Sequence, residues 1–315
     1  MTAALPFPPA GSVVTVGSFD GVHVGHVAVL REISERARAA GRVSVLVTFE
    51  PHPMEVVNPT AAPPLLTTPV ERREILAQTD LDYAVILRFD ERLRAMAPER
   101  FVRDILLDRL AMRELVIGED HGFGRGRQGD VAMLRVLGAR LGFAIDVVPP
   151  VRDPVAGIVS SSRIRTAVAH GDLALARRLL GRPFALAAVV IQGARRGQSI
   201  GVPTINLPVP PRKMLPPDGV YAVRVEWPGG RAGGMLNQGP RPTVGDMTRT
   251  IEAHVFDFDG DLYGQWAKIE WVARLRDVQR FESLAALRQQ LARDRIEALR
   301  VLHQNNREQG VGSRE

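Results

Sequence analysis

The first half of the chain alternates short apolar runs with segments of helical period, and this alternation constrains the fold more than any other feature. The apolar runs are rich in valine and isoleucine and cover residues 13–16, 43–49, 83–87, 114–117 and 143–148. Between them lie segments such as 27–39 and 131–141, where apolar residues recur every three or four positions. Strands that alternate with helices in this way form a parallel sheet with helices on its faces.

The pattern changes near residue 183, after a glycine and a proline that end a helical segment. From there, short strands are expected at residues 185–192, 219–226, 233–237, 250–256 and 265–274, separated by Gly, Pro and Asp turns. This spacing predicts an antiparallel sheet or barrel. A helix over 283–303 follows, and residues 305–315 are expected to be a frayed tail. We therefore expect two domains, 1–182 and 183–315.

Local signals mark several helix starts in the first half. Thr68 is a predicted N-cap, with Pro69 at the first helical position and Glu71 placed to complete a capping box. Asp130 is a second predicted N-cap. The proline-rich stretch 50–68 has little periodicity, which is typical of a substrate-binding or lid loop, although a solvated excursion fits the pattern equally well.

The composition limits the cellular compartment and the binding partners that we expect for this chain. The chain has 315 residues, 45% of them hydrophobic, and no cysteine, which fits a reducing cytoplasm. No apolar run reaches membrane-spanning length, and residues 1–10 lack the features of a secretory signal. The net charge is +6, but arginines and acidic residues are interspersed. We expect no nucleic-acid or membrane partner, and the sequence does not predict an oligomeric state.

The segment that follows the first strand predicts a phosphate site. The β-branched run breaks at Gly17, and a turn through Asp20 and Gly21 leads to His23 and His26 at a helix start. A helix N-terminus offers unpaired N–H groups and the positive end of the helix dipole, both suited to phosphate oxygens. Histidines three residues apart share one helix face. The same pair would also serve simply to cap or pack the helix.

Two other loops are expected near this one. The loop 118–130 leaves a strand at the same edge of the sheet, where ligands of such folds bind. The run 160–165 combines three serines with Arg163 and Arg165 at a helix start. This donor set suits a polyphosphate, although alone it fits an ordinary capped helix with solvated arginines.

Together, Gly17-x-Phe19-Asp20-Gly21-Val22-His23-x-Gly25-His26 and Ser160-Ser161-Ser162-Arg163-Ile164-Arg165 resemble the paired signatures of nucleotidylyltransferases, in the form found in bacterial FAD synthetases. The resemblance implies an ATP site made by Gly17, Phe19, Asp20, Gly21, His23, His26, Ser161, Arg163 and Arg165. In that site His23 and His26 would hold the ATP phosphates. Arg163, with Ser161 and Arg165, would clamp the departing pyrophosphate.

The same resemblance implies a flavin site. Thr48-Phe49-Glu50-Pro51-His52-Pro53 is similar to a loop of the family in which His52 would contact a phosphate or the flavin. His52 would otherwise only shape the turn. The 118–130 loop follows the family segment that includes Asp120 and Phe123, with His121 and Gly122 as departures. Class I aminoacyl-tRNA synthetases also use His-x-Gly-His, but the Lys-Met-Ser-Lys-Ser loop that accompanies it is missing.

The second half carries a glycine-punctuated loop, 192–206, that resembles the Gly-rich loop and Pro-Thr-x-Asn motif of riboflavin kinases. The resemblance implies that Gly193, Gly197 and Gly201 close over ATP, that Thr204 and Asn206 bind Mg²⁺ and phosphates, and that Glu252 is the general base. Gln198 and Val202 depart from the family pattern. Without the resemblance, Glu252 fits an exposed position on an amphipathic strand, and Thr204 and Asn206 fit turn or strand-end positions.

We therefore expect a Rossmann-like parallel-sheet nucleotidylyltransferase domain followed by an antiparallel β-barrel riboflavin kinase domain with a C-terminal helix. The implied enzyme makes FMN from riboflavin and ATP, then FAD and pyrophosphate from FMN and ATP, with Mg²⁺ at both sites. The alternatives are an adenylyl- or cytidylyltransferase for another phosphate ester, a flavin-binding or regulatory protein with inactive sites, and a nucleic-acid-binding module.

Overall fold

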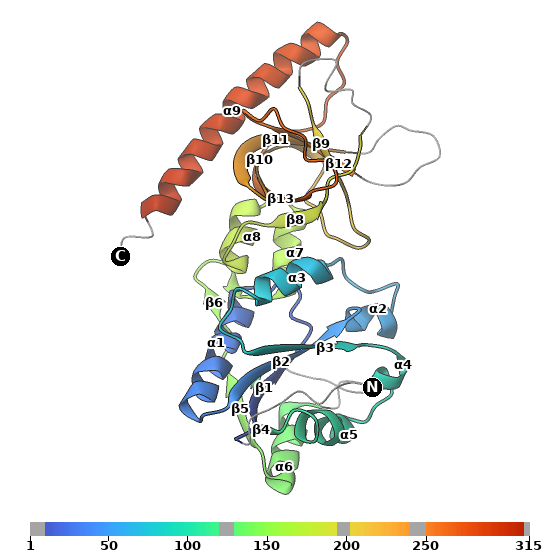
Figure 1. Cartoon of the computed structure of the whole chain (residues 1–315), viewed down its shortest axis with the longest axis vertical. Helices are drawn as coiled ribbons and strands as arrows, with labels where there is room; N and C mark the ends of the chain where they lie inside the picture. Colours follow the sequence, from blue (N-terminus) through green and yellow to red (C-terminus); the bar gives the residue numbers. More distant parts are fainter. Residues whose placement is uncertain (1–9, 120–128, 194–201, 240–249, 312–315) are drawn as a thin grey trace. The chain divides into compact units, whose positions relative to one another are not determined.

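The computed structural model describes residues 10–119, 129–193, 202–239 and 250–311 (Figure 1). The chain divides into two compact units, Met1–Ser161 and Ser162–Glu315. Within the described ranges, no helix combines the length and the apolar character needed to cross a membrane.

The first unit is built on a five-stranded parallel sheet. Its strands are β1 (Ser12–Val16), β2 (Val43–Glu50), β3 (Tyr83–Arg88), β4 (Met112–Gly118) and β5 (Ala144–Val148). They pair in the order β3-β2-β1-β4-β5, and every pair is parallel, as the sequence predicts. The strand order reverses between β1 and β4. In open α/β sheets this switch point, at the carboxyl ends of the strands, forms a ligand-binding crevice.

Helices cover both faces of this sheet. On one face, α1 (Val24–Ala39) and α3 (Pro69–Leu76) pack apolar side chains against alternate strand residues such as Val13 and Leu46. On the other face, α5 (Pro98–Phe101), η1 (Val102–Leu107) and α6 (Val131–Leu141) pack against the intervening residues, including Val14. This division follows from the two-residue period of a strand, which points neighbouring side chains to opposite faces.

The proline-rich stretch is more ordered than the sequence predicts. It contains a short helix, α2 (Pro53–Val57), and its last residues, Leu66, Thr67 and Thr68, are buried. The stretch is therefore not a solvated excursion throughout. The predicted capping box of α3 is confirmed, since Thr68 accepts the N–H of Glu71 and the Glu71 carboxylate accepts the N–H of Thr68. Asp130 caps α6 as predicted.

A short helix and a two-stranded hairpin also belong to the first unit. The helix α4 (Glu91–Arg94) follows β3, and the strands β6 (Arg152–Asp153) and β7 (Gly157–Ile158) form a short antiparallel hairpin after β5.

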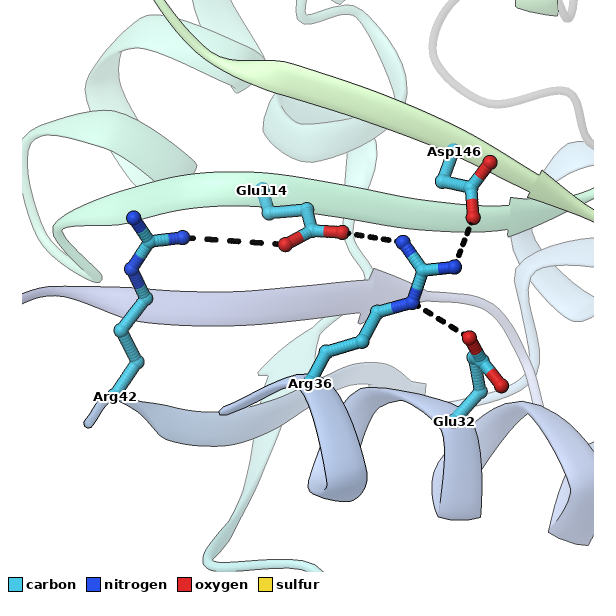
Figure 2. Close-up of polar contacts among 5 residues, drawn as sticks. All are labelled: Glu32, Arg36, Arg42, Glu114 and Asp146. Atoms are coloured by element: carbon cyan, nitrogen blue, oxygen red, sulfur yellow. Dashed lines mark hydrogen bonds and ion pairs between the residues drawn. The ribbon is translucent and has the colours of Figure 1, made fainter. Parts of the chain in front are cut away.

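An ion-pair network ties the last turns of α1 to the sheet (Figure 2). The Arg36 guanidinium bonds Glu32 through Nε at 2.6 Å and Glu114 through Nη1 at 2.6 Å, and its Nη2 bonds Asp146. Arg42 approaches the other oxygen of Glu114 at 3.9 Å. Glu114 lies on β4 and Asp146 on β5, so one guanidinium links a helix to two strands.

The second unit is a nearly closed antiparallel barrel. Its strands are β8 (Ala185–Val189), β9 (Ile205–Pro208), β10 (Gly219–Trp227), β11 (Gly230–Gln238), β12 (Thr250–Val255) and β13 (Trp266–Arg276). They pair in the order β8-β13-β10-β11-β12-β9, and a bridge between Ile191 and Asn206 brings the two ends together. The predicted barrel is confirmed. The short strand β9 is one that the sequence reading missed.

Three helices accompany the barrel: α7 (Ser161–Ala169), which begins at the division between the units, α8 (Leu173–Leu180) and α9 (Leu284–Val311). Asp172 caps the start of α8. The predicted frayed tail 305–315 is wrong in part, since α9 continues to Val311. The Asn305 side chain accepts hydrogen bonds from Arg177 at 2.9 Å and Arg224 at 3.1 Å, and these bonds fix the helix beyond its predicted end.

Candidate active sites

The turn after β1 brings two histidines and a phenylalanine into one stack. Phe19 and Val22 have positive φ angles of 49° and 36°, an uncommon backbone state for residues with side chains. The rings of His23 and His26 stack at 3.6 Å between centroids, and Phe19 stacks on His26 at 4.4 Å. The turn therefore holds both imidazoles in a fixed arrangement at the switch-point edge of the sheet.

His23 is also the N-cap of α1, which starts three residues earlier than the sequence predicts. Its Nδ1 accepts the backbone N–H of His26 at 3.3 Å. A neutral imidazole that accepts through Nδ1 carries its proton on Nε2, so Nε2 is the donor atom of this ring. The capping interpretation and the phosphate interpretation are thus compatible, because they use different nitrogens.

Asp20 anchors the turn to the end of the proline-rich stretch. Its buried carboxylate accepts the N–H groups of Leu66 at 3.1 Å and Thr67 at 3.0 Å, and the Thr67 hydroxyl at 3.2 Å. The same hydroxyl accepts the N–H of Gly21 at 3.0 Å. Asp20 therefore sets the path of the turn, and sequence spacing gave no sign that residues 66 and 67 are its partners.

Arg72 is a further residue that sequence reasoning missed. Its guanidinium donates to the carbonyl oxygens of Ser18 at 2.9 Å and Phe49 at 2.8 Å. Ser18 follows strand β1, and Phe49 lies near the end of strand β2. Burial lowers the pKa of Arg72, and the charges of Glu50 and Asp20 work in the opposite direction. The side chain places a buried positive charge directly behind the turn.

The two sequence signatures of the first half meet through a hydrogen bond. The Ser161 hydroxyl donates to the Asp20 carbonyl oxygen at 2.9 Å, across 141 positions of sequence. Arg163 is exposed and Arg165 is half-buried on α7. Because residues four apart share a helix face, Ser161 and Arg165 lie on the same side of that helix.

His52 has a structural role that its position between two prolines suggested. Its Nδ1 accepts the N–H of Met54 at 3.2 Å, and the Glu55 carboxylate accepts the N–H of His52 at 3.1 Å, which completes a capping box for α2. Contact of His52 with a flavin stays a prediction. The other two predicted flavin residues, Asp120 and Phe123, lie outside the described residues.

The barrel carries a cavity of about 510 Å³ at one end of β8, β9 and β12. Gly193 and Thr204, both predicted to bind ATP, line it together with Asp259, Asp261 and Tyr263 from the segment after β12. Gly197 and Gly201 lie outside the described residues. Asp259 is a lining residue that sequence reasoning missed.

Glu252 and Asn206 are directly opposite each other in the β12–β9 ladder. Opposed residues of an antiparallel pair project from the same face, so the two side chains are neighbours. A Cβ on Gly193 would lie 2.1 Å from the amide nitrogen of Asn206, so any larger residue at 193 would force that side chain to shift. Glu252 is half-buried while Ile251 and Ala253 are fully buried, as the amphipathic pattern predicts.

These residues fit a magnesium site of the kind that is completed by nucleotide phosphates. Thr204, Asp259 and Asp261 line the cavity, and their hydroxyl and carboxylate oxygens are hard donors, which Mg²⁺ prefers. Asn206 and Glu252 are not among the lining residues; Asn206 is next to Ile205, which lines the cavity. No group of three or more His, Cys, Asp or Glu residues in the described part of the chain forms a metal cage by itself. Mg²⁺ usually takes one or two protein oxygens together with substrate phosphates.

The fold, the turn after β1 and the cavity of the barrel are typical of a two-domain enzyme that binds nucleotides. Comparisons with known proteins identify the family. A family model for FAD synthetase matches residues 7–163, and a model for riboflavin kinase matches residues 180–302. Relatives described as bifunctional riboflavin kinase/FMN adenylyltransferase include one from Escherichia coli K12, 39% identical over 92% of this chain and 93% of the relative. One from Pseudomonas fluorescens is 40% identical over 93% of each chain.

A solved structure described as a macrolide-efflux protein from Streptococcus pneumoniae aligns with a TM-score of 0.81 at 32% identity, covering 91% of this chain and 93% of that chain. The chain belongs to the bifunctional riboflavin kinase/FMN adenylyltransferase family. It is a transferase that converts riboflavin to FMN and FMN to FAD, with ATP as co-substrate.

Proposed function

We propose that adenylyl transfer to FMN takes place at the turn after β1. The N-terminus of α1 and the Nε2 donor of His23 would bind ATP phosphates together with His26, while Arg163 and Arg165 hold the departing pyrophosphate. The observation that carries this assignment is the hydrogen bond from Ser161 to the Asp20 carbonyl, which joins the two signatures.

In this reaction an oxygen of the FMN phosphate attacks the α-phosphorus of ATP, and the bond to pyrophosphate breaks. No covalent enzyme intermediate is required. Rate enhancement comes from aligning the two phosphates and from donors that stabilise the charge on the transferring group. Gly17, Phe19 and Gly21 shape the pocket through the turn that Asp20 anchors, and Arg72 contributes a positive charge behind it.

Riboflavin phosphorylation is assigned to the barrel cavity. Glu252 would accept the proton of the ribityl hydroxyl as that oxygen attacks the γ-phosphorus of ATP, with ADP as the leaving group. Positioned proton transfer of this kind contributes about 10²–10⁴-fold to a rate. Asn206, its cross-strand neighbour, and Thr204 would hold ATP phosphates and Mg²⁺, which supplies charge neutralisation when bound.

Further features of the enzyme stand as proposals on the family resemblance. The flavin of FMN would contact His52, Asp120 and Phe123, and the glycines at 193, 197 and 201 would let a loop close over ATP. Mg²⁺ would serve both sites. The domains would divide at residue 183, and the enzyme would act in the cytoplasm without nucleic-acid or membrane partners.

The test is to incubate the protein with riboflavin, ATP and Mg²⁺ and to separate the flavins by chromatography. We expect FMN to appear first and FAD to follow. An absence of FMN would overturn the kinase assignment, and FMN that never proceeds to FAD would overturn the adenylyltransferase assignment. Replacing ATP by CTP separates the proposal from a cytidylyltransferase, which would make a cytidylyl product instead.

A further inference from the structure

The second unit contains another cavity, of about 440 Å³, that shares no lining residue with the cavity assigned to ATP. Three elements line it: α8 through Arg177 and Arg178, the barrel through Arg224 and Trp271, and α9 through Asn305. All five residues belong to one compact unit. The cavity is therefore a separate feature of the barrel and its helices.

The cavity concentrates positive charge. Three arginines line it, and the lining residues in the described part of the chain include no carboxylate. Arg177 and Arg224 both donate to the same amide oxygen of Asn305, which draws two guanidiniums toward one point. Like charges held together in a concave, partly desolvated site raise the local positive potential and attract anions.

Arg224 is the most buried member of this group, with 7% of its surface exposed. Burial lowers its pKa, as do the charges of Arg231 and Arg177, whereas Glu270 raises it. Glu270 is itself paired with Arg231 at 2.7 Å and Lys268 at 3.0 Å. Glu270, whose charge acts on Arg224, is thus shared with two other cations.

The remaining wall is apolar and is formed in part by Leu173, Pro183, Trp271 and Val272. A few convergent polar groups on an apolar wall, in a volume of a few hundred Å³, are typical of small-molecule sites. The guanidinium fork matches phosphate oxygens in a bidentate geometry.

We propose that this cavity between α8, the barrel and α9 is a binding site for a phosphate-bearing anion, separate from both active sites. An anion here bonds Arg178 of α8 and Arg224 of β10 at once, next to the point where Asn305 fixes α9. Bound ligand therefore holds the two helices against the barrel and slows their local opening.

The test uses the full chain without Mg²⁺, with inorganic pyrophosphate as the probe and NaCl as the ionic-strength control. Hydrogen–deuterium exchange measures protection in residues 173–180 and 299–305 as pyrophosphate is added. We expect saturable protection in both segments. Arg178→Gln, at an exposed position, and Arg224→Gln should each weaken the apparent affinity about tenfold or more, the usual effect of losing a charge-assisted hydrogen bond.

Arg300→Gln is the matched control, because Arg300 is on α9 but bonds Glu297 and does not line the cavity. It should titrate as the wild type does. A second titration with AMP identifies the source of the phosphate group. A higher apparent affinity for AMP than for pyrophosphate indicates an organic phosphate whose organic part contacts the apolar wall. A lower apparent affinity for AMP indicates a site for inorganic anions. Protection by neither probe, or equal protection in Arg178→Gln and the wild type, overturns the proposal.

Discussion

Replacing Arg36 with methionine should destabilise the first unit by about 2–4 kcal/mol, because one guanidinium bonds three carboxylates on three elements. Burial works against the charged form of Arg36. The hydrogen bonds that Arg36 donates to Glu114 and Glu32, together with the charge of Asp146, outweigh burial and raise the pKa of Arg36 above its usual value. Methionine keeps most of the aliphatic stem and removes only the charge and the donors.

The magnitude follows from the exposure of each partner. Glu114 is 16% exposed, and a charge-assisted hydrogen bond to such a group contributes about 1.5–3 kcal/mol. Glu32 and Asp146 are 36% and 44% exposed, so solvent screening limits each of those pairs to about 0.3–1 kcal/mol. Arg42, 3.9 Å from Glu114, partly replaces the lost charge.

The assay is urea unfolding followed by far-UV circular dichroism, combined with hydrogen exchange of the amides in α1 and β4. Arg100→Gln is the control, since Arg100 is 72% exposed and bonds Asp104 one helical turn away. It should change the free energy of unfolding by less than about 0.5 kcal/mol. If Arg36→Met destabilises no more than Arg100→Gln does, the reasoning is refuted.

Two further predictions concern individual contacts, and a third concerns the metal. Asp20→Ala removes the acceptor of two backbone N–H groups and of the Thr67 hydroxyl, so we expect a loss of about 2–4 kcal/mol in urea unfolding and a sharp fall in FAD formation, with FMN formation retained. Burial raises the pKa of Tyr221 in the folded protein, and Arg274 opposes this shift. The neutral phenol therefore contributes its full stabilisation below the unfolded pKa of about 10. That stabilisation is lost as the pH rises through the higher pKa of the folded state. The free energy of unfolding of the wild type should therefore fall more steeply above pH 10 than that of Tyr221→Phe, and parallel curves would contradict this. Chelation of Mg²⁺ by EDTA should stop both FMN and FAD formation, and added Mg²⁺ should restore them; activity in excess EDTA would rule out the metal.

The sequence predicts those parts of the fold that depend on local patterns. The helix caps predicted at Thr68 and Asp130 are confirmed, because short polar side chains bond nearby backbone N–H groups. The cap at His52 was not predicted, since histidine is an uncommon N-cap. The strand β9 was missed because it has only four residues, the last of which is a proline.

Parts of the site that depend on distant contacts could not be predicted. Asp20 meets residues 46 and 47 positions away, and Arg72 meets a carbonyl 54 positions away, without any spacing that marks them as partners. The end of α9 was misjudged for the same reason, because Asn305 is fixed by arginines 128 and 81 positions earlier. Tertiary contacts such as these follow from the folded topology and have no local signature.

A crossed activity assay tests whether one chain carries two separate active sites. His26→Ala should abolish FAD formation while FMN formation from riboflavin continues. Glu252→Ala should abolish FMN formation while supplied FMN is still converted to FAD. If either substitution removed both activities from a protein that remains folded by circular dichroism, the two-site assignment would be contradicted.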